Sequence, residues 1–106
     1  MTIIFKKMPV YLVSSYNIHD YETYKTYPAR IAPLISRYGG RALAMELNPE
    51  AIQGKPKNMH TIIEFPSEEA IQNLYNDPEY ELVIYLRDIS TSDCTMVIVK
   101  GFERGS

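Results

Sequence analysis

Residues 59–80, MHTIIEFPSEEAIQNLYNDPEY, contain a strand followed by the starts of two helices. The opening MHTIIEF is rich in β-branched and aromatic side chains, which favour a strand. Pro66 ends that strand, Ser67 can cap a helix, and two glutamates follow where the helix dipole favours negative charge. Asp77 and the proline after it form a second cap. The stretch therefore predicts one helix ending near Asn76 and a further short helix after it.

The residues before this stretch predict a strand, a helix and a second strand. Residues 9–16 are β-branched and aromatic with proline at the entry, which suits a strand. Residues 21–38 place apolar side chains at helical spacing after an aspartate cap, and two prolines predict a kink near Tyr27. Two glycines end that helix. Residues 41–47, RALAMEL, then predict a strand, and a loop rich in Pro, Gly and Asn leads into the strand at 59–65.

A last strand at residues 94–102, CTMVIVKGF, completes the order β-α-β-β-α-β with a small extra helix. This order is the ferredoxin-like pattern, an α+β fold in which helices cover one face of a four-stranded antiparallel sheet. We expect one domain over residues 8–102, with residues 1–7 and 103–106 as peripheral termini.

Composition excludes several classes of protein. The chain has 106 residues, 45% of them hydrophobic, and a formal net charge of -2 without a run of like charge. Nucleic acid and membrane are therefore not expected partners. Cys94 is the only cysteine, so no intrachain disulfide can form and a cytoplasmic location is expected. With two histidines and one cysteine, a closed zinc site is not expected.

The strands are apolar on both faces. Alternation puts apolar side chains on each side of the segments at 10–13, VYLV, and 96–99, MVIV, and Ile62 opposes Ile63. Helices can cover only one face of such a sheet, and an uncovered apolar face drives association. We expect a homodimer in which two sheets meet face to face. The alternative is a monomer whose second face is covered by a long loop or by the N-terminal extension.

Several segments, in order, resemble the domain of unknown function 1330 family from about Met8 to Phe102. They are MPVYLV at 8–13, the helix with Tyr24 and Tyr27, YGGR at 38–41, Gly54, IIEFPS at 62–67, LYNDPEY at 74–80, Arg87, and 99–101. The resemblance implies a dimeric α/β barrel, the fold also used by cofactor-free monooxygenases of antibiotic biosynthesis and by several small isomerases. It does not imply an activity. Members typically carry an arginine at the start of the third strand, where this chain has Met59.

Two residues are candidates for acid–base or anion chemistry. His60 lies in the third predicted strand, where an imidazole can transfer protons near neutral pH. Glu64 on the same face is about 13 Å away, too far for a hydrogen-bonded dyad, and a histidine with its hydrogen bonds satisfied is the alternative. Arg87 follows an apolar run and can bind a carboxylate ligand. The alternative for Arg87 is a structural ion pair, with Glu64 as its natural partner.

Tyrosines complete the candidate ligand-binding set, because a ring with a polar tip suits the lining of an apolar pocket. The alternative is that they only pack in the core. The candidate ligand-binding residues are Tyr16, Tyr27, Glu64, Tyr75, Tyr80 and Arg87.

Three functions remain open from the sequence. The first is a homodimeric protein that binds a small apolar or acidic ligand between sheet and helices. The second is a cofactor-independent enzyme of monooxygenase or isomerase type, in which His60 or a tyrosine moves a proton. The third is a structural dimer without a ligand. None of them calls for a cofactor or a metal.

Overall fold

The computed structural model describes residues 8–102, and the expected peripheral termini at 1–7 and 103–106 lie outside the described residues. In chain order the elements are β1 (Val10–Ile18), α1 (Tyr21–Tyr24), α2 (Tyr27–Arg37), β2 (Arg41–Leu47), β3 (Met59–Phe65), α3 (Glu68–Tyr75), α4 (Pro78–Ser90) and β4 (Thr91–Lys100).

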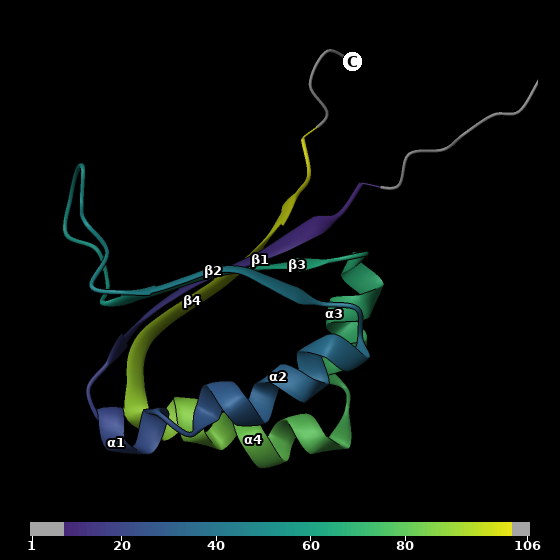
Figure 1. The fold of residues 1–106 in the computed structure, drawn as a ribbon, viewed down its shortest axis with the longest axis horizontal. Coiled ribbons are helices and arrows are strands. Elements are labelled where there is room, and N and C mark those ends of the chain that lie inside the picture. Colours follow the sequence, from purple (N-terminus) through teal and green to yellow (C-terminus); the bar gives the residue numbers. More distant parts are fainter. Residues whose placement is uncertain (1–7, 103–106) are drawn as a thin grey trace, which may run out of the picture.

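The four strands form one antiparallel sheet in the order β2-β3-β1-β4. Every helix lies on the same side of this sheet, and the loop between β2 and β3 rises on the opposite side (Figure 1). The predicted α+β, ferredoxin-like fold with a four-stranded antiparallel sheet is therefore confirmed. We call the helix-covered side the inner face and the other side the outer face.

Local signals set most element boundaries. Ser67 accepts a hydrogen bond from the Ala70 backbone N–H at 3.1 Å, so it caps α3 as expected. Asp77 likewise accepts from the Glu79 backbone N–H at 2.9 Å and caps α4. The predicted kink near Tyr27 is a break, because the helix expected at 21–38 divides into α1 and α2. No helix within residues 8–102 is long and apolar enough to cross a membrane.

Several boundaries differ from the sequence prediction. The strand expected at 9–16 is β1 at Val10–Ile18, and the last strand, expected at 94–102, ends at Lys100. The short helix expected after Asp77 is the longest of the fold, with 13 residues, and it runs directly into β4 at Thr91 rather than at residue 94. Side chains close its end, since the hydroxyl of Thr91 donates to the Arg87 carbonyl at 2.6 Å and that of Ser90 donates to the Leu86 carbonyl. No Gly or Pro marks this junction, so a sequence pattern cannot reveal it.

The core lies between the inner face and the helices. Alternate residues of β1, Val10, Leu12 and Tyr16 among them, are at most 7% exposed, and Phe65 of β3 is fully buried. The helices add Ile31 and Leu34 of α2, Ile71 and Leu74 of α3, and Val83 and Leu86 of α4, and the cluster also contains Tyr24, Tyr27 and Met59. Burial of these side chains is the main force that holds the helices on the sheet.

The outer face has an apolar centre. Strand register aligns Ala44, Ile62, Val13 and Val97 in one row across all four strands, since directly opposed residues of antiparallel strands share a face. Ile62 is 38% exposed and Val97 is 52% exposed. No helix within residues 8–102 covers this row, which we call the central row.

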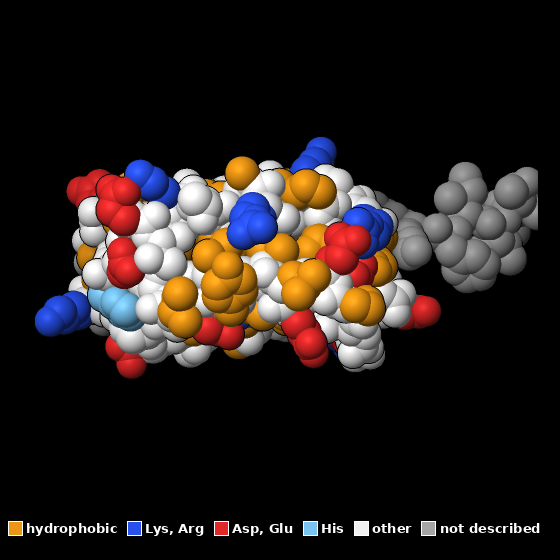
Figure 2. Space-filling view, turned by 90° about the horizontal axis from the view of Figure 1, so that it is seen from below, with side chains coloured by type: hydrophobic (Ala, Val, Ile, Leu, Met, Phe, Trp, Pro, Cys, Tyr) orange, Lys and Arg blue, Asp and Glu red, His pale blue; other side chains and the backbone are white. Residues whose placement is uncertain are grey.

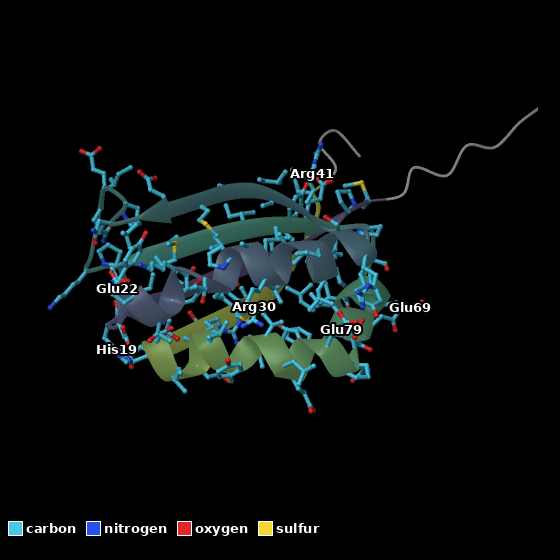
Figure 3. The ribbon with its side chains drawn as sticks, turned by 60° about the horizontal axis from the view of Figure 1, so that its bottom comes forward. His19, Glu22, Arg30, Arg41, Glu69 and Glu79 are labelled. Atoms are coloured by element: carbon cyan, nitrogen blue, oxygen red, sulfur yellow. The ribbon has the colours of Figure 1, made fainter. Side chains whose placement is uncertain are left out.

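Two rows that contain polar and charged residues flank the central row. On one side the register aligns Glu46, His60, Ser15 and Thr95, and on the other it aligns Arg41, Glu64, Tyr11 and Val99. Arg41 lies on the sheet side of the molecule, away from the helices that carry Arg30 and Glu79 (Figure 3). The outer face is thus an apolar band with a partly charged border, which is typical of a protein contact surface.

The helical side also exposes apolar side chains. Leu82, Tyr85 and Ile89 of α4 are 69%, 48% and 59% exposed. Hydrophobic side chains gather between charged ones on this side (Figure 2). The molecule therefore has two apolar surfaces on opposite sides.

Candidate functional site

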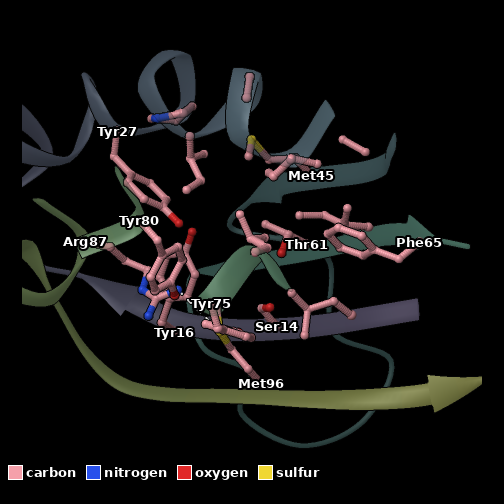
Figure 4. Close-up of a pocket in the computed structure, with 18 of the residues that line it drawn as sticks. Ser14, Tyr16, Tyr27, Met45, Thr61, Phe65, Tyr75, Tyr80, Arg87 and Met96 are labelled. Atoms are coloured by element: carbon pink, nitrogen blue, oxygen red, sulfur yellow. Dashed lines mark hydrogen bonds between the residues drawn. The ribbon is translucent and has the colours of Figure 1, made fainter. Parts of the chain in front are cut away.

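A cavity of about 220 Å³ lies between the inner face and the helices. Its lining comes from all four strands and from α2, α3 and α4, and it is mostly apolar (Figure 4). The lining residues are Leu12, Ser14, Tyr16, Tyr27, Pro28, Ile31, Ala32, Ile35, Ala42, Ala44, Met45, Thr61, Ile63, Phe65, Leu74, Tyr75, Tyr80, Arg87 and Met96. An apolar cavity with a few polar groups is the usual form of a small-molecule site.

Arg87 brings a charge into this cavity. The residue is 8% exposed, and its guanidinium points among the side chains of Tyr16, Tyr75 and Tyr80 (Figure 4). Its Nη1 donates to the Met96 sulfur at 3.3 Å, and its Nη2 lies 3.6 Å from a carboxylate oxygen of Asp88, which is largely exposed. Its Nε is buried without a hydrogen-bond partner among residues 8–102. The cation is therefore only partly compensated by the described residues.

Tyrosines surround the cation. The hydroxyls of Tyr16 and Tyr24 are 2.6 Å apart, and the Tyr24 ring packs on Tyr27 with centroids 5.7 Å apart. The rings of Tyr75 and Tyr80 meet edge to face at 4.9 Å. All four tyrosines predicted as ligand-binding residues, Tyr16, Tyr27, Tyr75 and Tyr80, thus line one cavity together with Arg87.

Burial keeps the tyrosine hydroxyls of this cavity in the protonated form. It raises the pKa of Tyr27 to about 12 and raises the pKa of Tyr16 and of Tyr80 further. Burial lowers the pKa of the Arg87 guanidinium, but Tyr27, Tyr80 and other neighbours together raise that pKa by more, so Arg87 is charged. At neutral pH this end of the cavity presents a cation and phenolic O–H groups, which suit an anionic ligand group.

Two hydroxyl residues form part of the sheet floor. Ser14 of β1 and Thr61 of β3 are direct partners in the sheet and are 2% and 6% exposed. The sequence analysis did not single them out as ligand-binding residues. The sequence feature that could have identified Ser14 is the alternation Val10, Leu12, Ser14, in which a polar residue follows two apolar ones on one face of the strand.

Two candidate residues lie away from the cavity. Glu64 is on the outer face, where a carboxylate oxygen is 3.5 Å from Nη2 of Arg41. The expected ion pair between Glu64 and Arg87 is therefore wrong, because Glu64 alternates with the inward-facing Ile63 and Phe65.

His60 also belongs to the outer face. It lines an open groove between the sheet and the loop from Pro49 to Pro56, and it is opposite Glu46 in the sheet. The structure therefore does not bring His60 together with Arg87 or with the tyrosines.

Metal-binding groups do not cluster in the part of the chain that the structure describes. Within residues 8–102, no three His, Cys, Asp or Glu side chains are arranged to hold a metal ion.

Solved structures share this fold at low sequence identity. A protein of unknown function from Rhodopseudomonas palustris has a TM-score of 0.79 at 18% identity, over 92% of this chain and 85% of that chain. A dimeric ferredoxin-like protein of unknown function from Thermobifida fusca has a TM-score of 0.62 at 10% identity, over 92% and 94%. A candidate antibiotic biosynthesis monooxygenase from Nitrosomonas europaea has a TM-score of 0.57 at 10% identity, over 98% and 100%.

These likenesses establish the fold and not an activity. No curated protein matches the chain. The family comparison agrees with the resemblance seen in the sequence and spans nearly all of the described residues. This chain belongs to the domain of unknown function family DUF1330, which matches residues 9–102.

Proposed function

We propose that the chain forms a homodimer in which each protomer binds a compact, mostly apolar carboxylic acid in the cavity between sheet and helices. The observation that carries this proposal is the buried guanidinium of Arg87. Its Nε has no partner among residues 8–102, and its nearest carboxylate is largely exposed.

A carboxylate is the ligand group that best completes the surroundings of Arg87. A buried charge is costly unless it is paired and hydrogen-bonded, and an arginine can donate two parallel hydrogen bonds to one carboxylate. The neighbouring phenols of Tyr27 and Tyr80 stay protonated, so they can donate to the same oxygens. A cationic ligand is disfavoured, because this end of the cavity already holds a positive charge.

The cavity volume sets the size of the acid. An apolar cavity of about 150 Å³ can hold benzene, whereas this one has about 220 Å³. The remaining space suits one carboxylate or a few further atoms. The ligand class is therefore an acid with a single ring or a short branched chain.

The homodimer is proposed from the outer face. Its central row exposes apolar surface across four strands, and a second copy would remove that surface from water. Proteins of the same fold from Thermobifida fusca and Bacteroides fragilis are described as dimeric, which supports a homodimer here.

The second candidate function, a cofactor-independent enzyme, finds less support in the geometry. It rests on the likeness to the candidate monooxygenase from Nitrosomonas europaea, which is 10% identical. The phenols of the cavity have pKa values raised far from neutrality, and His60 lies on the other face of the sheet. These groups favour binding over proton transfer.

Calorimetric titration of the purified protein tests the binding proposal. We expect benzoate or phenylacetate to bind and benzamide, which has no charge, to bind at least about tenfold more weakly. Arg87→Met should remove this preference for the acid. The variant should still fold, since replacing a poorly compensated buried charge by an apolar side chain is often neutral or stabilising.

Arg30→Met is the matched control, because Arg30 is exposed on α2 and lies outside the cavity lining. It should bind the acids as the wild-type protein does. Failure of all compact acids to bind, or equal binding by Arg87→Met and the wild-type protein, contradicts the proposal.

A further inference from the structure

The side chain of Ser14 is a second unpartnered polar group in the cavity. Ser14 is 2% exposed, and its Oγ has no hydrogen-bond partner among the residues that the structure describes. Most buried hydroxyls in proteins are hydrogen-bonded, so an orphaned one in a cavity wall marks a place where a ligand atom can bind. Figure 4 draws Ser14 on β1 beneath the cavity, beside Thr61.

Ser14 and Arg87 are linked through Met96. Met96 is the β4 residue directly opposite Ser14 in the sheet. The same methionine sulfur accepts from Arg87 Nη1 at 3.3 Å. Ser14 and Arg87 therefore both neighbour Met96, and all three residues line the same cavity.

The two unpartnered groups differ in the hydrogen bonds that they can form. Arg87 only donates hydrogen bonds, whereas a serine hydroxyl can both donate and accept. A ligand with only a carboxylate and an apolar body would bind Arg87 but leave the serine hydroxyl unpaired. A second oxygen on the ligand would pair with it, and a site built to hydrogen-bond a ligand oxygen rejects the analogue that lacks it.

We infer that the acid bound in this cavity carries a second oxygen function, a hydroxyl or carbonyl, which hydrogen-bonds to Ser14 while the carboxylate binds Arg87. The inference rests on the proposed function, because it assumes that an acid occupies the cavity. It makes Ser14 a specificity-determining residue, whereas Arg87 supplies the affinity for acids in general.

Titration of benzoate, 3-hydroxybenzoate and 4-hydroxybenzoate tests it. In the wild-type protein, at least one hydroxylated acid should bind about tenfold more tightly than benzoate. In Ser14→Ala this preference should fall below about twofold. Ser15→Ala is the matched control and should keep the preference, because Ser15 faces the other side of the sheet and its hydroxyl is 3.0 Å from the Thr95 hydroxyl.

A stability measurement separates loss of folding from loss of recognition. Ser14→Ala removes a hydroxyl that has no partner among residues 8–102, so its melting temperature without ligand should equal or exceed that of the wild-type protein. A much lower melting temperature would mean that the hydroxyl is already paired within the protein, and this would overturn the inference.

The outcomes distinguish the inference from the proposed function. If benzoate binds through Arg87 but neither hydroxylated acid binds more tightly, the inference fails and the proposed function stands. A preference that survives in Ser14→Ala also overturns the inference, because another group then binds the second oxygen. If no acid binds at all, both fail.

Discussion

Ile62→Glu should dissociate the proposed homodimer. Ile62 occupies the central row of the outer face between Ala44 and Val13, and 38% of it is exposed in the protomer. In a face-to-face dimer this exposed part lies against the partner. The substitution places a carboxylate at the same point in both protomers.

The structure gives a lower bound on the loss of dimer affinity in Ile62→Glu. Full burial of an isoleucine side chain contributes about 1.5–3 kcal/mol, so covering the 38% that is exposed contributes about 0.6–1.1 kcal/mol. The dimer contains two copies, and losing both contributions costs about 1.1–2.3 kcal/mol, or about 7- to 50-fold in Kd. Burying two carboxylates adds a further desolvation cost, so about 7-fold is a lower bound.

Sedimentation velocity over a micromolar concentration series measures this change. Ile89→Glu is the matched control, because Ile89 is 59% exposed on α4, on the helical side of the molecule. The control should remain a dimer with the wild-type Kd. Circular dichroism of both variants checks that the protomer keeps its fold.

The opposite pattern refutes the reasoning. If Ile89→Glu dissociates while Ile62→Glu does not, the interface lies on the exposed α4 surface formed by Leu82, Tyr85 and Ile89. A wild-type protein that is monomeric throughout the series refutes the homodimer itself.

Two further predictions concern stability. Asp77 accepts from Tyr38 Oη at 2.6 Å and from Arg37 Nη1 at 2.8 Å, and these contacts, with that of Tyr38 the largest, lower the pKa of its carboxyl below the ordinary 3.8. The ionised carboxyl therefore stabilises the fold fully above the ordinary pKa, and this stabilisation is lost as pH falls below 3.8 towards the lowered pKa. Asp77→Asn should have a lower free energy of unfolding than the wild-type protein at neutral pH, and the gap between the two should shrink on acidification. A gap that stays constant with pH in urea unfolding would contradict this. A Cβ at Gly40 would lie 2.5 Å from Ile35 Cγ2 and 2.7 Å from Cε1 of the buried Phe65, so Gly40→Ala should cost about 1–3 kcal/mol of unfolding free energy. An unchanged melting temperature for Gly40→Ala would show that this corner is not tightly packed.

Elements with a local stop signal could be predicted from the sequence. The strand expected at 59–65 and the following helix match β3 and α3, because Pro66 and Ser67 mark the boundary between them. The junction of α4 and β4 could not be predicted, since it depends on side-chain hydrogen bonds rather than on Gly or Pro.

An irregularity in β2 could not be predicted from the sequence either. The register with β3 shifts between Ala42 and Ala44, so the alternation of RALAMEL changes faces at Leu43. This shift puts both Ala42 and Met45 opposite inward-facing residues of β3, and both line the cavity. Nothing in the sequence marks the bulge, because it contains neither glycine nor proline.

The candidate site was only partly predictable for a related reason. Arg87 and the tyrosines were identified because a cation next to an apolar run and amphipathic rings are unusual in a core. Glu64 was assigned to the wrong side, because both faces of its strand are apolar and the pattern does not say which one the helices cover. Ser14 was missed because its role as a ligand-binding candidate depends on the cavity that it lines, which only the structure shows.

The Arg87 side chain offers the most direct measurement of the central claim. The Nε–H group of Arg87 is buried without a hydrogen-bond partner among residues 8–102. Nitrogen–proton NMR spectra of the arginine side chains, assigned with Arg87→Met, report on this group during titration. We predict that the Arg87 signal moves strongly on addition of benzoate and stays in place with benzamide. An Arg87 signal that does not move while calorimetry shows benzoate bound would contradict the account.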